Sequence, residues 1–102
     1  MQYNKLVRDK IPQIIAEKGG SCKTAILSNE EYLCKLEEKL SEELEEYLES
    51  RDLEELADLL EVMEALVKAR GEHWDDLMQF KEEKRAKRGG FDDQILLIES
   101  HK

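Results

Sequence analysis

Two pairs of acidic residues are the part of this sequence best suited to chemistry. Glu43 lies three residues before Glu46, and Glu55 lies three residues before Asp58. Residues three apart share one side of an α-helix, so each pair presents two carboxylates together. Two such helices packed side by side would gather oxygen ligands of the kind that hard divalent cations such as Mg²⁺ prefer. The spacing therefore predicts a metal site formed by Glu43, Glu46, Glu55 and Asp58.

The apolar residues around the first pair indicate which way it faces. At about 100° per residue, Glu43 falls inside the apolar stripe of its helix and Glu46 falls at the edge of that stripe. The stripe consists of Leu33, Leu36, Leu40, Leu44 and Tyr47. An unpaired ionised carboxylate in a core is strongly disfavoured, whereas several carboxylates around a cation are satisfied. The pattern leaves a second interpretation open, in which these are ordinary members of the 25 acidic residues and lie on solvated faces.

The helix that carries the second pair is apolar on two sides. One stripe consists of Leu53, Leu56, Leu60, Met63 and Val67, and the other of Leu59, Val62 and Leu66. Glu55 lines up with the second stripe and Asp58 flanks it. Because a helix that is apolar on two sides needs neighbours on both, and the chain is short, we expect a second subunit to complete the core.

Composition narrows the class of protein. The 102 residues leave room for one domain, residues 1–102, and the net charge of −9 argues against binding to nucleic acid or to an anionic membrane. The sequence shows no signal peptide and no membrane span, and Cys22 and Cys34 fit no zinc or redox spacing. We therefore expect a cytoplasmic protein with reduced thiols.

Helix signals divide the chain into four helical segments. A capping box of Ser28 and Glu31 predicts the start of the second segment, and Asp52 with Glu55 forms the same pattern before the third. Glycines mark the ends of the first, third and fourth segments. The first predicted helix ends near Lys18. The other three cover about residues 29–49, 53–70 and 74–87.

Two short segments have the composition of β-strands. Residues 22–27 and 94–98 are bounded by turn residues and contain residues that favour strands. These two segments are the only strand candidates in the sequence, so each can pair only with the other. The predicted fold is therefore mainly all-α, a helical bundle with a minor two-stranded β patch.

A basic stripe follows the apolar residues of the last helix. It consists of Lys81, Lys84, Arg85 and Arg88, and it leads to Gly89 and Gly90. In an acidic protein such a stripe is a candidate for binding the phosphates of a substrate. The alternative is that these side chains extend over the end of the bundle and pair with glutamates. Arg8 and Lys10 have the same two interpretations.

Other catalytic signatures are absent. His73 and His101 are the only histidines, and the sequence contains no Ser-His-Asp set, no Gly-rich phosphate loop and no GxGxxG motif. If the chain is an enzyme, its chemistry must depend on metal and carboxylates.

Three segments resemble a known superfamily. The chain carries Glu42-Glu43-Leu44-Glu45-Glu46 followed by Glu55-Leu56-Ala57-Asp58, which match the EExxE and ExxD motifs of the MazG and phosphoribosyl-ATP pyrophosphohydrolase superfamily. The opening residues 3–12 and the closing residues 84–91 are similar to those of short MazG-like proteins. The resemblance covers nearly the whole chain.

The resemblance implies a function and assigns roles to residues. It implies a helical homodimer or homotetramer that uses Mg²⁺ or Mn²⁺ to cleave a nucleoside triphosphate between its α and β phosphates. By position, Glu43, Glu46, Glu55 and Asp58 become the metal ligands, with Glu42 behind them or at a second metal. Glu43 or Glu46 would orient or deprotonate the attacking water. Lys84 and Arg88 match basic positions that the superfamily uses near phosphate. From the charge pattern we add Arg8 to the candidate phosphate ligands.

Two alternatives remain for the function. The first is hydrolysis of phosphoribosyl-ATP by an enzyme of the same fold. The second is a non-catalytic helical oligomer that serves as a scaffold or a regulatory partner. The presence of all four candidate ligands favours the enzyme over the scaffold, and the opening and closing segments place the chain nearer the MazG-like group.

Overall fold

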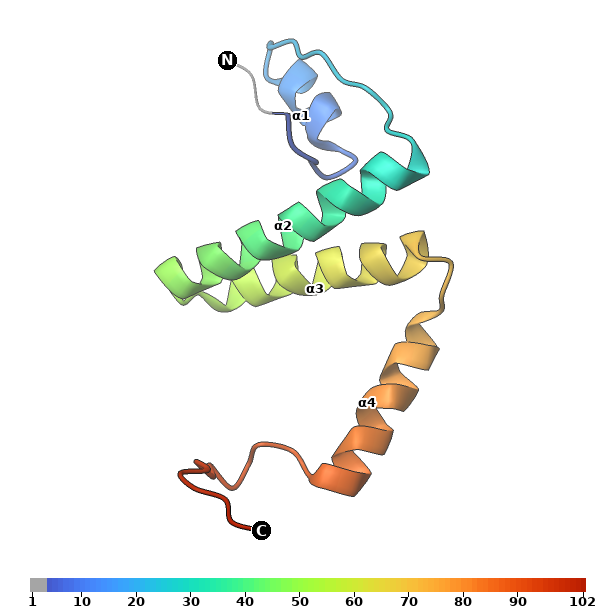
Figure 1. Cartoon of the computed structure of the whole chain (residues 1–102). Helices are drawn as coiled ribbons and strands as arrows, with labels where there is room; N and C mark the ends of the chain where they lie inside the picture. Colours follow the sequence, from blue (N-terminus) through green and yellow to red (C-terminus); the bar gives the residue numbers. More distant parts are fainter. Residues whose placement is uncertain (1–3) are drawn as a thin grey trace. The chain divides into compact units, whose positions relative to one another are not determined.

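The computed structural model describes residues 4–102, which form two units (Figure 1). The first unit ends at Glu72 and the second comprises His73–Lys102. The first contains α1 (Ile11–Glu17), α2 (Asn29–Ser50) and α3 (Leu53–Ala69), and the second contains α4 (Trp74–Arg88). The four predicted helices are thus present, with ends that differ from the predictions by one residue, and the all-α class is confirmed.

The start of α2 follows directly from the sequence. Ser28 Oγ accepts a hydrogen bond from the backbone N–H of Glu31 at 3.2 Å, and the Glu31 carboxylate accepts one from the backbone N–H of Ser28 at 3.4 Å. This reciprocal pair satisfies two donors that a helix start leaves without partners. The predicted capping box is confirmed.

The turn between α2 and α3 sets the geometry of the first unit. Arg51 adopts a left-handed conformation with φ of 62°, and its backbone N–H donates to the Tyr47 carbonyl at 2.7 Å. The chain therefore reverses within residues 51–52, and α2 and α3 pack against each other as an antiparallel hairpin (Figure 1). The capping box predicted for α3 is wrong, since the Asp52 side chain makes no capping hydrogen bond.

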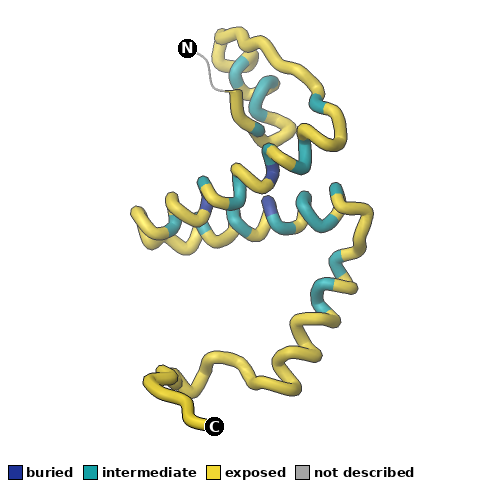
Figure 2. Tube along the Cα trace, in the orientation of Figure 1, coloured by how far each residue is buried: buried dark blue, intermediate teal, exposed yellow. Residues whose placement is uncertain are grey.

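The core of the first unit lies between these two helices (Figure 2). Leu36 of α2 and Val62 of α3 are 4% and 8% exposed. The stripe of α3 that contains Val62 is the less exposed one, whereas Leu53, Leu56 and Leu60 of the other stripe are 80%, 40% and 45% exposed. The hairpin thus uses one apolar side of α3 and leaves the other largely uncovered within this unit.

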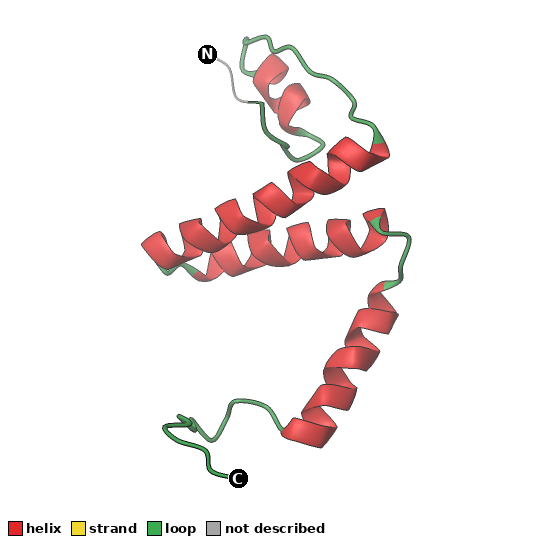
Figure 3. Cartoon of the chain, in the orientation of Figure 1, coloured by secondary structure: helices red, strands yellow, loops and turns green. Residues whose placement is uncertain are grey.

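The predicted two-stranded patch is not formed. Residues 22–27 and 94–98 have no regular secondary structure, and residues 4–102 contain no β-strand (Figure 3). Ile26 is 98% exposed, and Ile95 and Ile98 are each 83% exposed. A segment of five or six residues gains little from an extended conformation until its backbone groups pair in a ladder and one face is covered. The residue types of the two segments favour an extended conformation, but neither segment pairs with a partner strand within residues 4–102.

The second unit consists of α4 and the residues that follow it. Trp74, Leu77 and Met78 are its partly buried residues, and the basic side chains beyond them are exposed. Gly89, with φ of 82°, follows the last residue of the helix, in a conformation that glycine adopts without steric cost. No helix within residues 4–102 has both the length and the apolar character needed to cross a membrane.

Candidate metal centre

Glu43 is a carboxylate inside the α2–α3 interface. The residue is 7% exposed and is the one buried charged residue among those described. Its Oε1 lies 3.4 Å from Nζ of Lys39, one turn earlier on α2. Its Oε2 is buried and has no hydrogen-bond partner within residues 4–102. The predicted inward orientation of Glu43 is confirmed, and one of its oxygens is left without the partner that a buried polar atom normally has.

Other carboxylates approach Glu43 from both helices. Glu43, Glu55 and Asp58 form one group, and Glu42, Glu43 and Glu46 form another. Within each group the candidate ligand oxygens all lie within 4.8 Å of one another. The predicted set of four is thus divided into two groups that share Glu43, and Glu42 is an additional member. Glu46 is exposed, whereas Glu55 and Asp58 are half-buried.

The crowding of these carboxylates changes their acidity. Burial raises the pKa of Glu43, the neighbouring charge of Glu46 raises it further, and Lys39 partly opposes the shift. Burial also raises the pKa of Glu55, to which the charges of Asp58 and Glu43 add. Both effects make the ionised form less favourable in the folded chain. A divalent cation at this position would reverse them by supplying positive charge.

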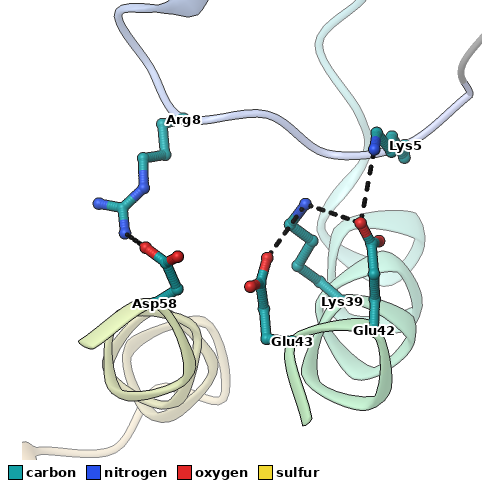
Figure 4. Close-up of polar contacts among 6 residues, drawn as sticks. All are labelled: Lys5, Arg8, Lys39, Glu42, Glu43 and Asp58. Atoms are coloured by element: carbon teal, nitrogen blue, oxygen red, sulfur yellow. Dashed lines mark hydrogen bonds and ion pairs between the residues drawn. The ribbon is translucent and has the colours of Figure 1, made fainter. Parts of the chain in front are cut away.

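Three basic side chains border the acidic cluster (Figure 4). Lys39 Nζ lies 3.4 Å from Oε1 of Glu42 and from Oε1 of Glu43. Lys5 Nζ, from the segment before α1, also lies 3.4 Å from Oε1 of Glu42. From the same segment, Arg8 donates from Nη2 to Oδ1 of Asp58 at 2.6 Å.

Sequence reasoning singled out Arg8 but missed Lys5 and Lys39 as neighbours of the site. Lys39 was detectable, because it precedes Glu42 by three residues and Glu43 by four and therefore shares their side of the helix. Lys5 was not detectable, because its contact with Glu42 joins residues 37 apart in the chain.

The predicted phosphate ligands Lys84 and Arg88 lie on α4. Both side chains are exposed, and they belong to the second unit. Of the basic stripe, Arg85 pairs with Asp92 at 3.4 Å and Lys81 with Glu82 at 3.5 Å. A role for Lys84 and Arg88 in the site stays a prediction.

The donor atoms fit a hard divalent cation. Glu43, Glu55 and Asp58 supply only oxygen atoms, which is the chemistry that Mg²⁺ and Mn²⁺ prefer. The unpartnered Oε2 of Glu43 is an acceptor within this cluster that a cation would satisfy. Glu43, Glu55 and Asp58 come from two packed helices, so backbone structure fixes the spacing of the cluster.

Comparisons with models of protein families, with curated proteins and with solved structures find no significant match for this chain. A relationship to the MazG superfamily therefore stays a prediction from the sequence motifs.

We expect Glu43→Gln to stabilise the metal-free protein at neutral pH. The folded state raises the pKa of Glu43. The Glu43 carboxyl therefore contributes its whole stabilising free energy below its ordinary pKa of 4.5, and this contribution is lost as pH rises through the raised pKa. In the presence of a chelator, urea unfolding at pH 7 should give the variant a free energy of unfolding roughly 1 kcal/mol higher than that of the parent protein. This is the scale for one unsatisfied buried polar group. The difference should shrink near pH 4.5.

Glu45→Gln is the matched control, because Glu45 is exposed on the same helix and loses the same charge. Equal effects of the two substitutions at both pH values would show that overall charge, and not the buried position of Glu43, is responsible.

Proposed function

We propose that this chain is a Mg²⁺- or Mn²⁺-dependent nucleotide pyrophosphohydrolase of the MazG-like type, which cleaves a nucleoside triphosphate to a monophosphate and pyrophosphate. The observation that carries the proposal is the buried, unpartnered Oε2 of Glu43 in a cluster with Glu55 and Asp58. The EExxE and ExxD motifs support it, because they contain these same residues.

The two carboxylate groups suggest how cations would be held. Glu43, Glu55 and Asp58 would bind one cation between α2 and α3. Glu42, Glu43 and Glu46 offer a second position, and Glu43 is common to both. When bound, such a cation would neutralise phosphate oxygens and lower the pKa of an attacking water.

The carboxylates also differ in their access to solvent. Glu43 is buried and is therefore suited to binding a cation, whereas Glu46 is exposed at the edge of the cluster. Glu46 is thus the better candidate to orient a water and accept its proton, the role expected of a general base. The sequence assigned this role to Glu43 or Glu46, and burial favours Glu46.

The phosphate chain of the substrate requires positive charge from the protein. Arg8 already lies beside Asp58 and supplies one guanidinium at the edge of the cluster. Lys84 and Arg88 are exposed cations on α4, and we assign them to the leaving pyrophosphate on the basis of the superfamily resemblance.

A second copy of the chain is the expected partner. Leu53, Leu56 and Leu60 form an exposed apolar stripe on α3, and Leu44 and Leu48 of α2 are 47% and 50% exposed. Apolar side chains at this density on one hairpin are typical of surfaces that become covered. A homodimer or homotetramer built on this stripe agrees with the organisation of the superfamily that the motifs resemble.

The first prediction from this proposal concerns turnover. The protein should release pyrophosphate from at least one member of a panel of nucleoside triphosphates and phosphoribosyl-ATP when Mg²⁺ or Mn²⁺ is present. Glu55→Gln and Asp58→Asn should each lower the rate by at least about a hundredfold, since residues that merely orient metal ligands already contribute about 10- to 100-fold. Glu45→Gln should retain the rate.

The panel also identifies the substrate class, because phosphoribosyl-ATP and the nucleoside triphosphates are tested side by side. If no substrate is cleaved and calorimetry detects no binding of Mg²⁺ or Mn²⁺, the helical scaffold becomes the better description of this protein.

The second prediction concerns Lys84 and Arg88. The double variant Lys84→Ala, Arg88→Ala should lower kcat/KM by roughly tenfold or more, because two charge-assisted contacts to phosphate would be lost. Its melting temperature should match that of the parent protein, since both side chains are exposed. Lys87→Ala, outside the basic stripe, is the control. A lower melting temperature with unchanged turnover per folded protein would instead assign the pair to bundle stability.

The third prediction concerns the oligomeric state. Light scattering at micromolar concentration should give the mass of a dimer or tetramer, and Leu56→Glu should reduce that mass by placing a charge on the apolar stripe. Ile26→Glu is the control, because Ile26 is exposed and lies outside the stripe. A monomeric parent protein would refute this prediction.

A further inference from the structure

The segment before α1 reaches the acidic cluster from a distant part of the sequence. Arg8 and Asp58 are 50 residues apart in the chain, and Lys5 and Glu42 are 37 residues apart. Nevertheless both pairs form, and Figure 4 shows Arg8 above α3 and Lys5 above α2. Residues 4–10 have no helical or strand structure, so the segment is placed by its contacts and not by a regular element.

The Arg8 contact engages a candidate metal ligand directly. Nη2 of Arg8 lies 2.6 Å from Oδ1 of Asp58, whose carboxylate belongs to the group with Glu43 and Glu55. A cation bound by that group would lie close to the guanidinium. Two positive charges at such a separation repel each other, so the Arg8–Asp58 pair and a bound divalent cation oppose each other.

The Arg8 side chain can leave without refolding the segment. Its backbone carbonyl accepts a hydrogen bond from the N–H of Ile11 at 3.0 Å, which ties the main chain to the start of α1. The side chain itself is 59% exposed. An exposed ion pair contributes little free energy, so several carboxylates binding one divalent cation outcompete it.

Lys39 differs from Arg8 in this respect. Its side chain is 19% exposed, and it contacts both Glu42 and Glu43 from within the same helix. It therefore remains beside the cluster whichever cation is present. Arg8 combines a direct contact to a member of the Glu43–Glu55–Asp58 group with an exposed side chain that is free to move.

We propose that Arg8 is an internal counter-ion of the metal site, which holds Asp58 in the metal-free protein, is displaced when Mg²⁺ or Mn²⁺ binds, and then pairs with the phosphates of the substrate. This inference rests on the proposed function. A guanidinium released beside a cation site meets the phosphate oxygens that the cation attracts, and its planar donors suit two of those oxygens at once. The segment before α1 thus couples binding of the metal to binding of the phosphate chain.

The experiment measures two affinities by calorimetry and needs no turnover. The first is the Kd for Mn²⁺ without any phosphate compound. We expect Arg8→Gln to tighten it by about two- to fivefold, the scale of one exposed ion pair that no longer competes. Lys10→Gln is the matched control, because Lys10 is an exposed residue of the same segment and loses the same charge. It should leave the Kd near that of the parent protein.

The second affinity is that for inorganic pyrophosphate with Mn²⁺ at saturation. Arg8→Gln should weaken it by roughly tenfold, because one charge-assisted contact to phosphate is lost. A single substitution should therefore move the two affinities in opposite directions. Arg8→Lys keeps the competing charge but not the planar donors, so it should retain the parent Kd for Mn²⁺ and weaken pyrophosphate binding. This variant also provides a test if Arg8→Gln does not fold.

Other outcomes overturn the inference. If Arg8→Gln lowers the melting temperature and leaves the Kd for Mn²⁺ unchanged or weaker, Arg8 serves only to attach the segment to α3. If pyrophosphate binding is unaffected, Arg8 is no phosphate ligand. If the parent protein itself takes up no Mn²⁺ or Mg²⁺, the proposed function fails first, and the inference fails with it.

Discussion

The burial of Glu43 between α2 and α3 is the constraint around which the first unit is organised. A carboxylate that loses water must find partners, and in the described residues Lys39 alone contacts one of its two oxygens while the other has none. Glu55 and Asp58 increase the electrostatic repulsion around Glu43, because they bring more negative charge to the same place. A hairpin optimised only for stability would place an apolar residue at position 43. Added positive charge at this place would stabilise the ionised carboxylates.

The distribution of basic residues around this cluster follows from the same requirement. In a chain with net charge −9, positive charge is scarce, yet Lys5, Arg8 and Lys39 all lie against the carboxylates of one hairpin. Two of the three come from outside the hairpin. Lys5 and Arg8 thus connect a segment without regular secondary structure to the hairpin, and these two exposed contacts are sensitive to whatever else occupies the cluster.

The helices supply rigidity where the site needs it. Residues 51–52 form a very short connection, and Arg51 accepts a left-handed conformation to permit it. With the two helices held at a fixed separation, Glu43 of α2 meets Glu55 and Asp58 of α3 across the interface. Only Leu36 and Val62 are buried apolar residues among those described, so this geometry depends on a small core. The exposed leucines of α3 represent apolar surface that the first unit leaves available for further packing.

Local patterns in the sequence determined the helices and the direction of Glu43. The Ser28 capping box, the glycines after α1, α3 and α4, and the helical period of the leucines are short-range signals, and each acts within one or two turns. The tertiary structure alone decided the rest. It divided the four predicted ligands into two groups that share Glu43, brought Lys5 and Arg8 to the cluster, and left residues 22–27 and 94–98 without strand partners. These outcomes depend on contacts between residues far apart in the chain, and no periodicity within a single segment encodes such contacts.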